Sequence, residues 1–183
     1  MSKTKGIAVF IVFLVLIVLA VLFTQAPSIE PHEGNVDALI IQFRDGITEL
    51  EAKTILENYN MTIYRLDYNI DYLPDKHYIM VDKDKVMDVK SELKKEENWT
   101  EPKPAIGKGN YYIITVPEQA IHDKNFLEIL NKYNLQLKKF VWCHVRFGKH
   151  PLSGISNEHA NELKSELETN ENIFSVDFES VFA

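Results

Sequence analysis

Cysteine and glycine are scarce in this chain of 183 residues, which has one cysteine and seven glycines. A single cysteine excludes an internal disulfide and a metal cluster held by several thiolates. The glycines form no phosphate-cradling loop, and the motifs Gly-x-Ser-x-Gly and His-Glu-x-x-His are also missing. The sequence therefore contains no established catalytic motif, and it predicts neither a cofactor nor an enzyme.

Positive charge is also in short supply. Lysine and arginine together number 20, against 27 aspartates and glutamates, and the net charge is −7. An acidic surface repels the phosphate backbones of DNA and RNA. We therefore expect no nucleic acid partner.

The longest apolar run lies near the N-terminus. Residues 6–23 carry no charge, and a helix of that length spans about 27 Å, close to the ~30 Å hydrocarbon layer of a membrane. Lys3 and Lys5 precede the run, and positively charged flanks stay in the cytoplasm. We predict a cytoplasmic tail at 1–5, a single transmembrane helix at 6–23 and a tether at 24–36. The C-terminal body would then lie outside the cytoplasm, anchored to the cell membrane.

A cleaved signal peptide is the alternative interpretation of this run. Thr24-Gln25-Ala26 offers small residues near a cleavage position, whereas the run is longer than a usual signal core of about 7–15 residues. Both interpretations place the body outside the cytoplasm.

The rest of the chain contains an internal repeat. Residues 55–63 recur as 129–137, which is 74 positions later, and the same shift carries 90–93 onto 164–167. Two matches at one shift indicate a single structural unit that is written twice.

Each copy has the pattern of helices that cover an antiparallel sheet. Thr48 and Glu51 form a capping box at the start of a helix, and apolar residues then follow at helical spacing. Short apolar or alternating runs predict strands before and after each helix. Two amphipathic helices on one face of a four-stranded sheet make a β-α-β-β-α-β unit. We predict an α+β fold with two tandem ferredoxin-like units, at 37–106 and 107–183, that dock onto each other.

Parts of each copy resemble the N-terminal prodomain of subtilisin-type proteases. The resemblance lies in Ile40-Ile41-Gln42-Phe43-Arg44-Asp45-Gly46-Ile47, in the turn Tyr59-Asn60-Met61 and in the closing run 172–177. It implies a ferredoxin-like module that inhibits or chaperones a protease. Asn60 stands where that family has glycine, and no protease domain follows.

The whole chain is similar to an uncharacterised family of proteins from methane-producing archaea, family 0228. Its members share the leading lysines, the apolar run and a first strand like Ala38-Leu39-Ile40-Ile41-Gln42-Phe43. This resemblance implies no activity.

The densest polar cluster is Cys143-His144, with Arg146 and His150 close by in sequence. A cysteine beside a histidine suggests a thiol nucleophile with its base, or a metal site. Neighbouring residues of a strand point to opposite faces of the sheet, which argues against both. We expect Cys143 inside and His144 outside.

A second candidate is the aspartate-rich loop of the first copy. Asp67, Asp71 and Asp75 alternate with tyrosines, and spaced aspartates can hold Ca²⁺. The loop lacks the glycine and the terminal glutamate of an EF-hand, so a solvated loop or a recognition surface is the preferred interpretation.

Two segments match the acceptor pattern for N-linked glycans. They are Asn60-Met61-Thr62 and Asn98-Trp99-Thr100. If the body lies outside the cytoplasm, both asparagines are open to modification.

These observations together favour a membrane-anchored, non-enzymatic module that binds a protein or peptide. One form of it is a prodomain-like protease inhibitor or chaperone that pairs a strand along an exposed sheet edge. The alternatives are a thiol or metal site around Cys143, His144 and His150, and a structural envelope protein that associates with itself.

Overall fold

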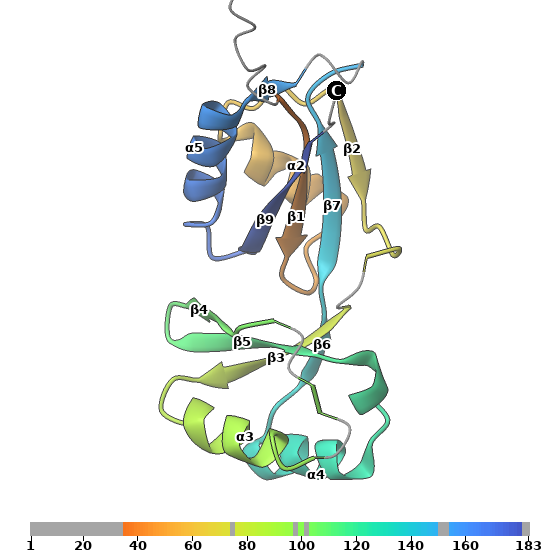
Figure 1. The fold of residues 1–183 in the computed structure, drawn as a ribbon, viewed down its shortest axis with the longest axis vertical. Coiled ribbons are helices and arrows are strands. Elements are labelled where there is room, and N and C mark those ends of the chain that lie inside the picture. Colours follow the sequence, from red (N-terminus) through yellow and green to blue (C-terminus); the bar gives the residue numbers. More distant parts are fainter. Residues whose placement is uncertain (1–34, 74–75, 97–98, 101–102, 150–153, 181–183) are drawn as a thin grey trace, which may run out of the picture. The chain divides into compact units, whose positions relative to one another are not determined.

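The computed structural model describes residues 35–73, 76–96, 99–100, 103–149 and 154–180 (Figure 1). Residues from Gly34 to Ala183 belong to one compact unit.

The predicted membrane helix at 6–23 lies outside the described residues, as does the tether up to residue 34. None of the helices that the structure describes is long and apolar enough to cross a membrane.

Four α-helices, one short 3₁₀ helix and nine strands are described. In chain order they are β1 (Asn35–Phe43), α2 (Glu49–Glu57), β2 (Arg65–Tyr68), β3 (His77–Asp82), α3 (Val86–Leu93), β4 (Ile106–Lys108), β5 (Tyr111–Val116), η1 (Glu118–Ala120), α4 (Lys124–Tyr133), β6 (Leu137–Lys139), β7 (Val141–Arg146), β8 (Ile155–Ser156), α5 (Asn157–Leu167) and β9 (Ile173–Ser180).

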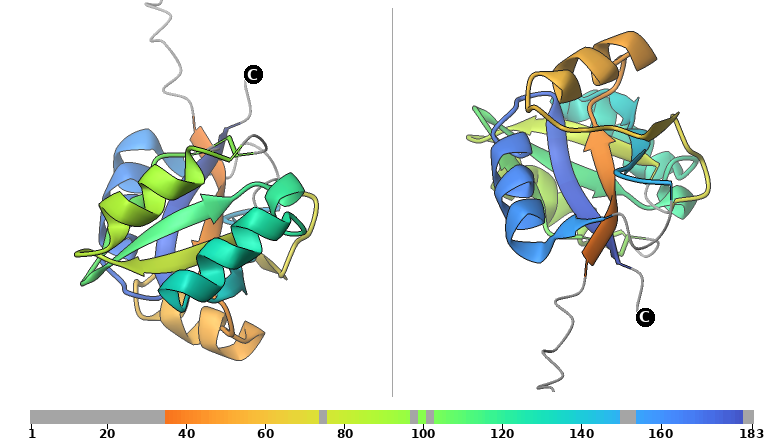
Figure 2. Two further views of the ribbon diagram at one scale, coloured as in Figure 1. Left: turned by 90° about the horizontal axis from the view of Figure 1, so that it is seen from below. Right: turned by 90° about the horizontal axis from the view of Figure 1, so that it is seen from above.

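One sheet contains β1 at its centre, with β7 on one side and β9 on the other. Strand β2 extends this sheet beyond β7, and the two-residue β8 pairs with the start of β1. All of these pairs are antiparallel. Residues of α2 and α5 pack with the strands in one apolar core, and Figure 2 shows both helices beside this sheet.

The second sheet has the order β4-β5-β3-β6, again with antiparallel neighbours. Helices α3 and α4 lie together on one side of it (Figure 1). The fold is therefore α+β with two antiparallel sheets, as the sequence predicted.

The division of the chain between the two sheets differs from the tandem boundaries at 37–106 and 107–183. Residues 77–139 form one β-α-β-β-α-β unit, which we call the inserted unit. Residues 35–68 and 141–180 form the other, which we call the outer unit. The inserted unit thus lies within the chain of the outer unit, between β2 and β7.

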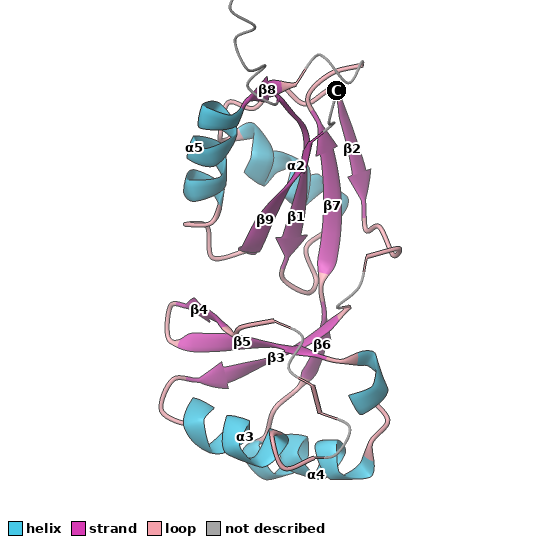
Figure 3. Ribbon diagram, in the orientation of Figure 1, coloured by secondary structure: helices cyan, strands magenta, loops and turns pink. Residues whose placement is uncertain are grey.

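Short connections explain the nesting. Strands β4 and β5 form a hairpin in which Lys108 pairs with Tyr111, and Gly109 turns the chain with a φ of +52°. This hairpin turn places β4 and β5 side by side in one sheet, although the tandem boundary at 106/107 falls within β4. Between β6 and β7 there is only Phe140, so the chain passes directly from the inserted sheet into the outer one (Figure 3).

The internal repeat crosses the two units. The repeated segment at 55–63 begins in α2 of the outer unit, whereas its copy at 129–137 begins in α4 of the inserted unit. The pair 90–93 and 164–167 lies in α3 and α5, and here the first copy is the inserted one. Each unit therefore combines half of one copy with half of the other.

Each unit has its own apolar core between its sheet and its helices. The outer core includes Leu39, Ile41, Leu56 and Leu167, all fully buried. The inserted core lies between strands β3 and β5 and helices α3 and α4. It includes the fully buried side chains of Ile79, Val81, Val89, Leu93, Ile114 and Val116. The alternating strands and the helical spacing of apolar residues in the sequence account for both cores.

A third, aromatic cluster joins the two units, and we call it the aromatic junction. The ring of Tyr78 from β3 stacks on Phe140 at 4.4 Å between centroids and meets Phe174 edge-on at 5.2 Å. Phe140 also contacts Trp142 from β7 at 6.2 Å. The cluster contains residues of both sheets, so the two units dock as the sequence analysis expected.

Candidate functional site: a cleft beside the aromatic junction

A cleft of about 630 Å³ opens beside the aromatic junction. It is lined by segments that are far apart in the sequence. They are the turn after β1, the middle of β3, the β4–β5 hairpin, β6 and the approach to β9; the lining residues are Arg44, Asp45, Tyr78, Met80, Lys108, Gly109, Asn110, Tyr111, Lys138, Thr169, Glu171 and Phe174.

Hydrogen bonds fix the wall that the turn after β1 forms. The Asp45 N–H donates to the Tyr78 hydroxyl at 2.9 Å, which ties this turn of the outer unit to a strand of the inserted unit. The Arg44 N–H donates to the Asn172 carbonyl at 3.0 Å. Burial raises the pKa of Tyr78, so its hydroxyl stays protonated and neutral at physiological pH.

Lys108 fixes the hairpin wall in a similar way. Its Nζ donates to the Glu168 carbonyl and, at 3.4 Å, to the Asn170 carbonyl, both at the C-terminal end of α5. Burial lowers the pKa of Lys108 because it disfavours the charged form. The ammonium thus serves to hold the two units together, and it leaves little of its hydrogen-bonding capacity for a ligand.

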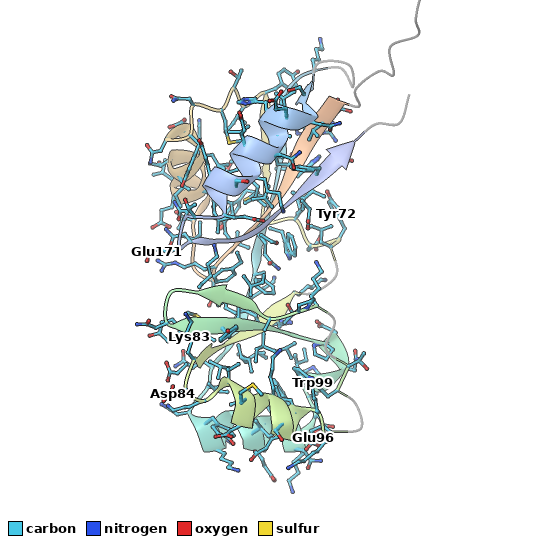
Figure 4. The ribbon with its side chains drawn as sticks, turned by 60° about the vertical axis from the view of Figure 1, so that its left-hand side comes forward. Tyr72, Lys83, Asp84, Glu96, Trp99 and Glu171 are labelled. Atoms are coloured by element: carbon cyan, nitrogen blue, oxygen red, sulfur yellow. The ribbon has the colours of Figure 1, made fainter. Side chains whose placement is uncertain are left out.

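Apart from Lys108, the cleft contains two cations and two carboxylates. Arg44 and Lys138 form no ion pair with any described residue, and Asp45 and Glu171 are the acidic members. Figure 4 shows Glu171 at the margin of the outer unit. With Lys108, three cations face two carboxylates in a chain whose net charge is −7. The cleft is therefore more favourable to an acidic ligand than the chain as a whole.

Cys143 and His144 lie on opposite faces of the outer sheet. Cys143 is fully buried in the outer core, and burial raises the pKa of its thiol to about 12. Cys143 is inside as expected, but the expectation that His144 lies outside is wrong: it is 4% exposed on the helix-free face, where Nε2 lies 2.5 Å from Glu179 and Nδ1 lies 3.7 Å from Asp67. The sheet separates the thiol from the imidazole, so they form no nucleophile–base pair, and His150 lies outside the described residues.

The aspartate-rich loop brings no set of ligands together in the described part of the chain. Asp67 pairs with Arg65 at 2.7 Å, Asp71 is exposed, and Asp75 lies outside the described residues. Over residues 35–73, 76–96, 99–100, 103–149 and 154–180, no group of three or more histidine, cysteine or acidic side chains could hold a metal ion.

The described strand edges are short or already covered. Strand β2 has four residues, and β4 and β6 have three each. At the edge of β9, Lys164 donates to the Val176 carbonyl and Glu168 accepts from the Val176 N–H at 3.0 Å. Short edges and charged side chains over an edge are ways to prevent strand addition.

Sequence reasoning did not find the cleft. Arg44-Asp45-Gly46 has the sequence of an ordinary turn, and Gly107-Lys108-Gly109-Asn110 follows the predicted boundary at 106/107. One signal was available, since Tyr78 places a hydroxyl in an apolar strand, and a buried hydroxyl needs a hydrogen-bond partner. The partner belongs to the outer unit, which only the three-dimensional structure identifies.

The fold defines a class of protein: an α+β body in which one β-α-β-β-α-β unit is inserted into the chain of another. The chain belongs to the uncharacterised protein family UPF0228, whose model matches residues 59–182. This confirms the family resemblance of the sequence.

Relatives in this family come from methane-producing archaea. One protein from Methanosarcina mazei is 50% identical over 187 residues, covering 96% of this chain and 96% of its own length. One from Methanosarcina acetivorans is 45% identical over 216 residues, covering 97% of this chain and 93% of the relative. Both are named only as UPF0228 proteins. No solved structure matches the chain.

Proposed function

We propose that this chain displays a non-enzymatic binding module on the outer side of the cell membrane, where residues 6–23 anchor it. The cleft beside the aromatic junction binds an extended segment of another protein or peptide. The observation that supports this most is the pair of cations Arg44 and Lys138, which line the cleft and form no ion pair with a described residue.

The chemistry of the cleft specifies the segment that it fits. An arginine guanidinium binds carboxylates with two parallel hydrogen bonds, and a lysine adds a second positive charge. Tyr111 is 43% exposed at the rim, and tyrosines are common anchors in protein interfaces. A volume of about 630 Å³ lies in the usual range of small-ligand pockets. We therefore propose a segment with a carboxylate next to an apolar side chain.

A protease inhibitor or chaperone is one form of this function, as the prodomain resemblance suggests. Strand pairing along a sheet edge would require a longer free edge than the described strands provide. If a protease is the partner, the proposed contact is therefore made through the cleft and not by strand addition.

The binding test uses the full-length chain in membrane vesicles and a random peptide library. We expect acidic, partly apolar peptides to be enriched and their binding to be lost in Lys138→Glu. Lys139→Glu is the matched control, because Lys139 is adjacent and exposed but does not line the cleft. Enrichment of peptides whose affinity is equal in both variants would refute the cleft as the binding site.

The location has a separate test. Protease treatment of intact cells should degrade the body, and deletion of residues 6–23 should release it from the membrane fraction. A body that stays protected in intact cells until they are lysed would contradict the proposed orientation.

A further inference from the structure

We propose that Asn60 carries an N-linked glycan, and that Asn134, its counterpart in the repeat, does not. The inference rests on the proposed location of the body outside the cytoplasm.

Asn60 occupies an exposed turn between α2 and β2. Its φ of +53° is left-handed, a conformation that asparagine tolerates better than most residues. The backbone N–H donates to the Glu57 carbonyl at 3.3 Å, and the side-chain amide has no partner among the described residues. The amide nitrogen is therefore free to react.

The three residues of the acceptor pattern alternate in exposure. Asn60 and Thr62 are exposed, whereas Met61 is half-buried against the outer core. Residues 61–63 belong to no helix or strand. Both groups that a glycosyl transferase must recognise are therefore exposed to solvent.

Asn134 provides an internal comparison. It ends α4 with a φ of +52°, and it is exposed like Asn60. Gln136 is exposed and Leu135 is half-buried, so the exposure pattern is the same. Only the third residue differs in the chemistry that matters, because Gln136 has no hydroxyl where Thr62 has one.

The reaction is a transfer of a glycan from a lipid-linked oligosaccharide phosphate donor. A bond forms between the Asn60 Nδ2 atom and carbon C1 of the first sugar, and the bond from C1 to the donor phosphate oxygen breaks. Nδ2 gives up one proton, and the lipid phosphate leaves with the electron pair. A membrane-bound oligosaccharyl transferase of the producing cell would catalyse the step.

The turn at Asn60 lies near the candidate cleft without lining it. None of the residues that line the cleft belongs to the turn at Asn60. Tyr59, next to Asn60, accepts from the Asn170 side chain at 3.2 Å, and Asn170 lies between the lining residues Thr169 and Glu171.

The test is intact-mass and glycopeptide mass spectrometry of the full-length protein from membranes of a methane-producing archaeon. We expect Asn60→Gln and Thr62→Ala each to lose the mass of one glycan, and Asn134→Gln to lose nothing. Gln136→Thr should gain one glycan, at Asn134. Asn98→Gln removes the second acceptor asparagine, so a glycan attached there can be distinguished from the one on Asn60.

Wild-type protein without a glycan on Asn60 would overturn the proposal. Protease treatment of intact cells then distinguishes the two possible failures. If the body is degraded, only the modification of Asn60 is refuted. If the body is protected, the proposed location fails as well.

Discussion

The outer unit and the inserted unit use the same arrangement of strands and helices but treat the helix-free face of the sheet differently. In the inserted unit this face presents Tyr78 and Ile113, each 1% exposed in the aromatic junction. In the outer unit this face contributes Trp142 and Phe174 to the same junction. It also presents His144 between two carboxylates, and Gln42, which accepts from Ser175 at 3.1 Å. Both sheets thus use apolar side chains for docking, and the outer sheet in addition buries polar groups that form hydrogen bonds with neighbouring side chains.

Corresponding strands make the contrast specific. The pair Ile40-Ile41 of β1 corresponds to Ile113-Ile114 of β5, as both precede a buried polar residue and the end of the strand. In the outer sheet Ile41 pairs with Cys143, and in the inserted sheet Ile114 pairs with Ile79. Cys143 therefore corresponds to Ile79. One step along each strand, His144 corresponds to Met80. The polar His144 thus stands where the inserted unit has the apolar Met80, on the helix-free face that the outer unit does not use for its core.

The largest effect that we predict tests the junction. Tyr78→Ala should lower the free energy of unfolding by about 3–5 kcal/mol, because it removes a buried ring from a packed cluster. Tyr78→Phe should cost only about 1 kcal/mol, since it removes the acceptor of the Asp45 N–H but keeps the ring. Urea denaturation followed by tryptophan fluorescence measures both.

Tyr111→Ala is the control for the junction variants, because Tyr111 lies in the same sheet but is 43% exposed. If Tyr78→Ala were no more destabilising than Tyr111→Ala, the junction would contribute little to the stability of either unit.

A smaller effect should follow at the edge of β9, where the two units differ again. Glu168→Ala leaves the Val176 N–H without its acceptor and should destabilise the protein by about 1–2 kcal/mol. The uncovered edge should also promote self-association. The inserted unit has Lys94 at the corresponding position of the repeat, so it has no carboxylate there to accept a backbone N–H.

Thermal unfolding and light scattering measure the effect at β9. Glu166→Ala serves as the control, because that side chain is exposed on the same helix and only its carbonyl accepts hydrogen bonds. Equal melting temperatures and equal scattering for the two variants would disprove the role of Glu168.

The helix caps predict a further difference between the units. Thr48 caps α2 in the outer unit, whereas Lys85 at the start of α3 makes no side-chain cap. Thr48→Ala should cost about 1 kcal/mol. Thr54→Ala in the same helix is the control, since Thr54 bonds only a carbonyl one turn back.

Acid should weaken the cap in wild-type protein. Hydrogen bonds from the Thr48 backbone and hydroxyl lower the pKa of Glu51. The contribution of Glu51 is therefore present above the ordinary carboxyl pKa and is lost as pH falls through the lowered value. Melting curves from pH 7 down to pH 2 should show a smaller acid-induced loss in Thr48→Ala than in wild type.

The smallest effect concerns Cys143, which replaces an aliphatic residue of the inserted unit. Burial raises its pKa from 9.0 to about 12, so the folded state holds the thiol proton more tightly than the unfolded state. Stability should therefore be unaffected at neutral pH and should decrease as pH rises above 9. A thiol reagent at pH 8 should label the folded protein far more slowly than the protein in urea; equal rates would show that Cys143 is accessible.

Local features of the structure were predictable from the sequence. The capping box at Thr48 and Glu51 is present, and Ser156 caps α5 by accepting from the His159 N–H. The predicted apolar faces of the helices are buried in the two cores. Such features depend on neighbours within one or two helical turns, and the sequence lists those neighbours directly.

The cleft was not predictable, because it depends on contacts between segments of distant sequence position. Arg44 lies in the turn after β1, Tyr78 in β3 and Lys138 in β6. Their spacing in the sequence does not predict that they lie close together, because their proximity follows from the insertion of one unit into the other.

The sequence by itself determined the helices, most of the strands and the fact that one unit is written twice. Only the tertiary structure decided which halves combine. Both copies have halves with the same order of strand, helix and strand, so local preference does not distinguish tandem from nested pairing. The two-residue turn at Gly109 made the choice, because a connection so short places β4 and β5 beside each other in one sheet, across the tandem boundary.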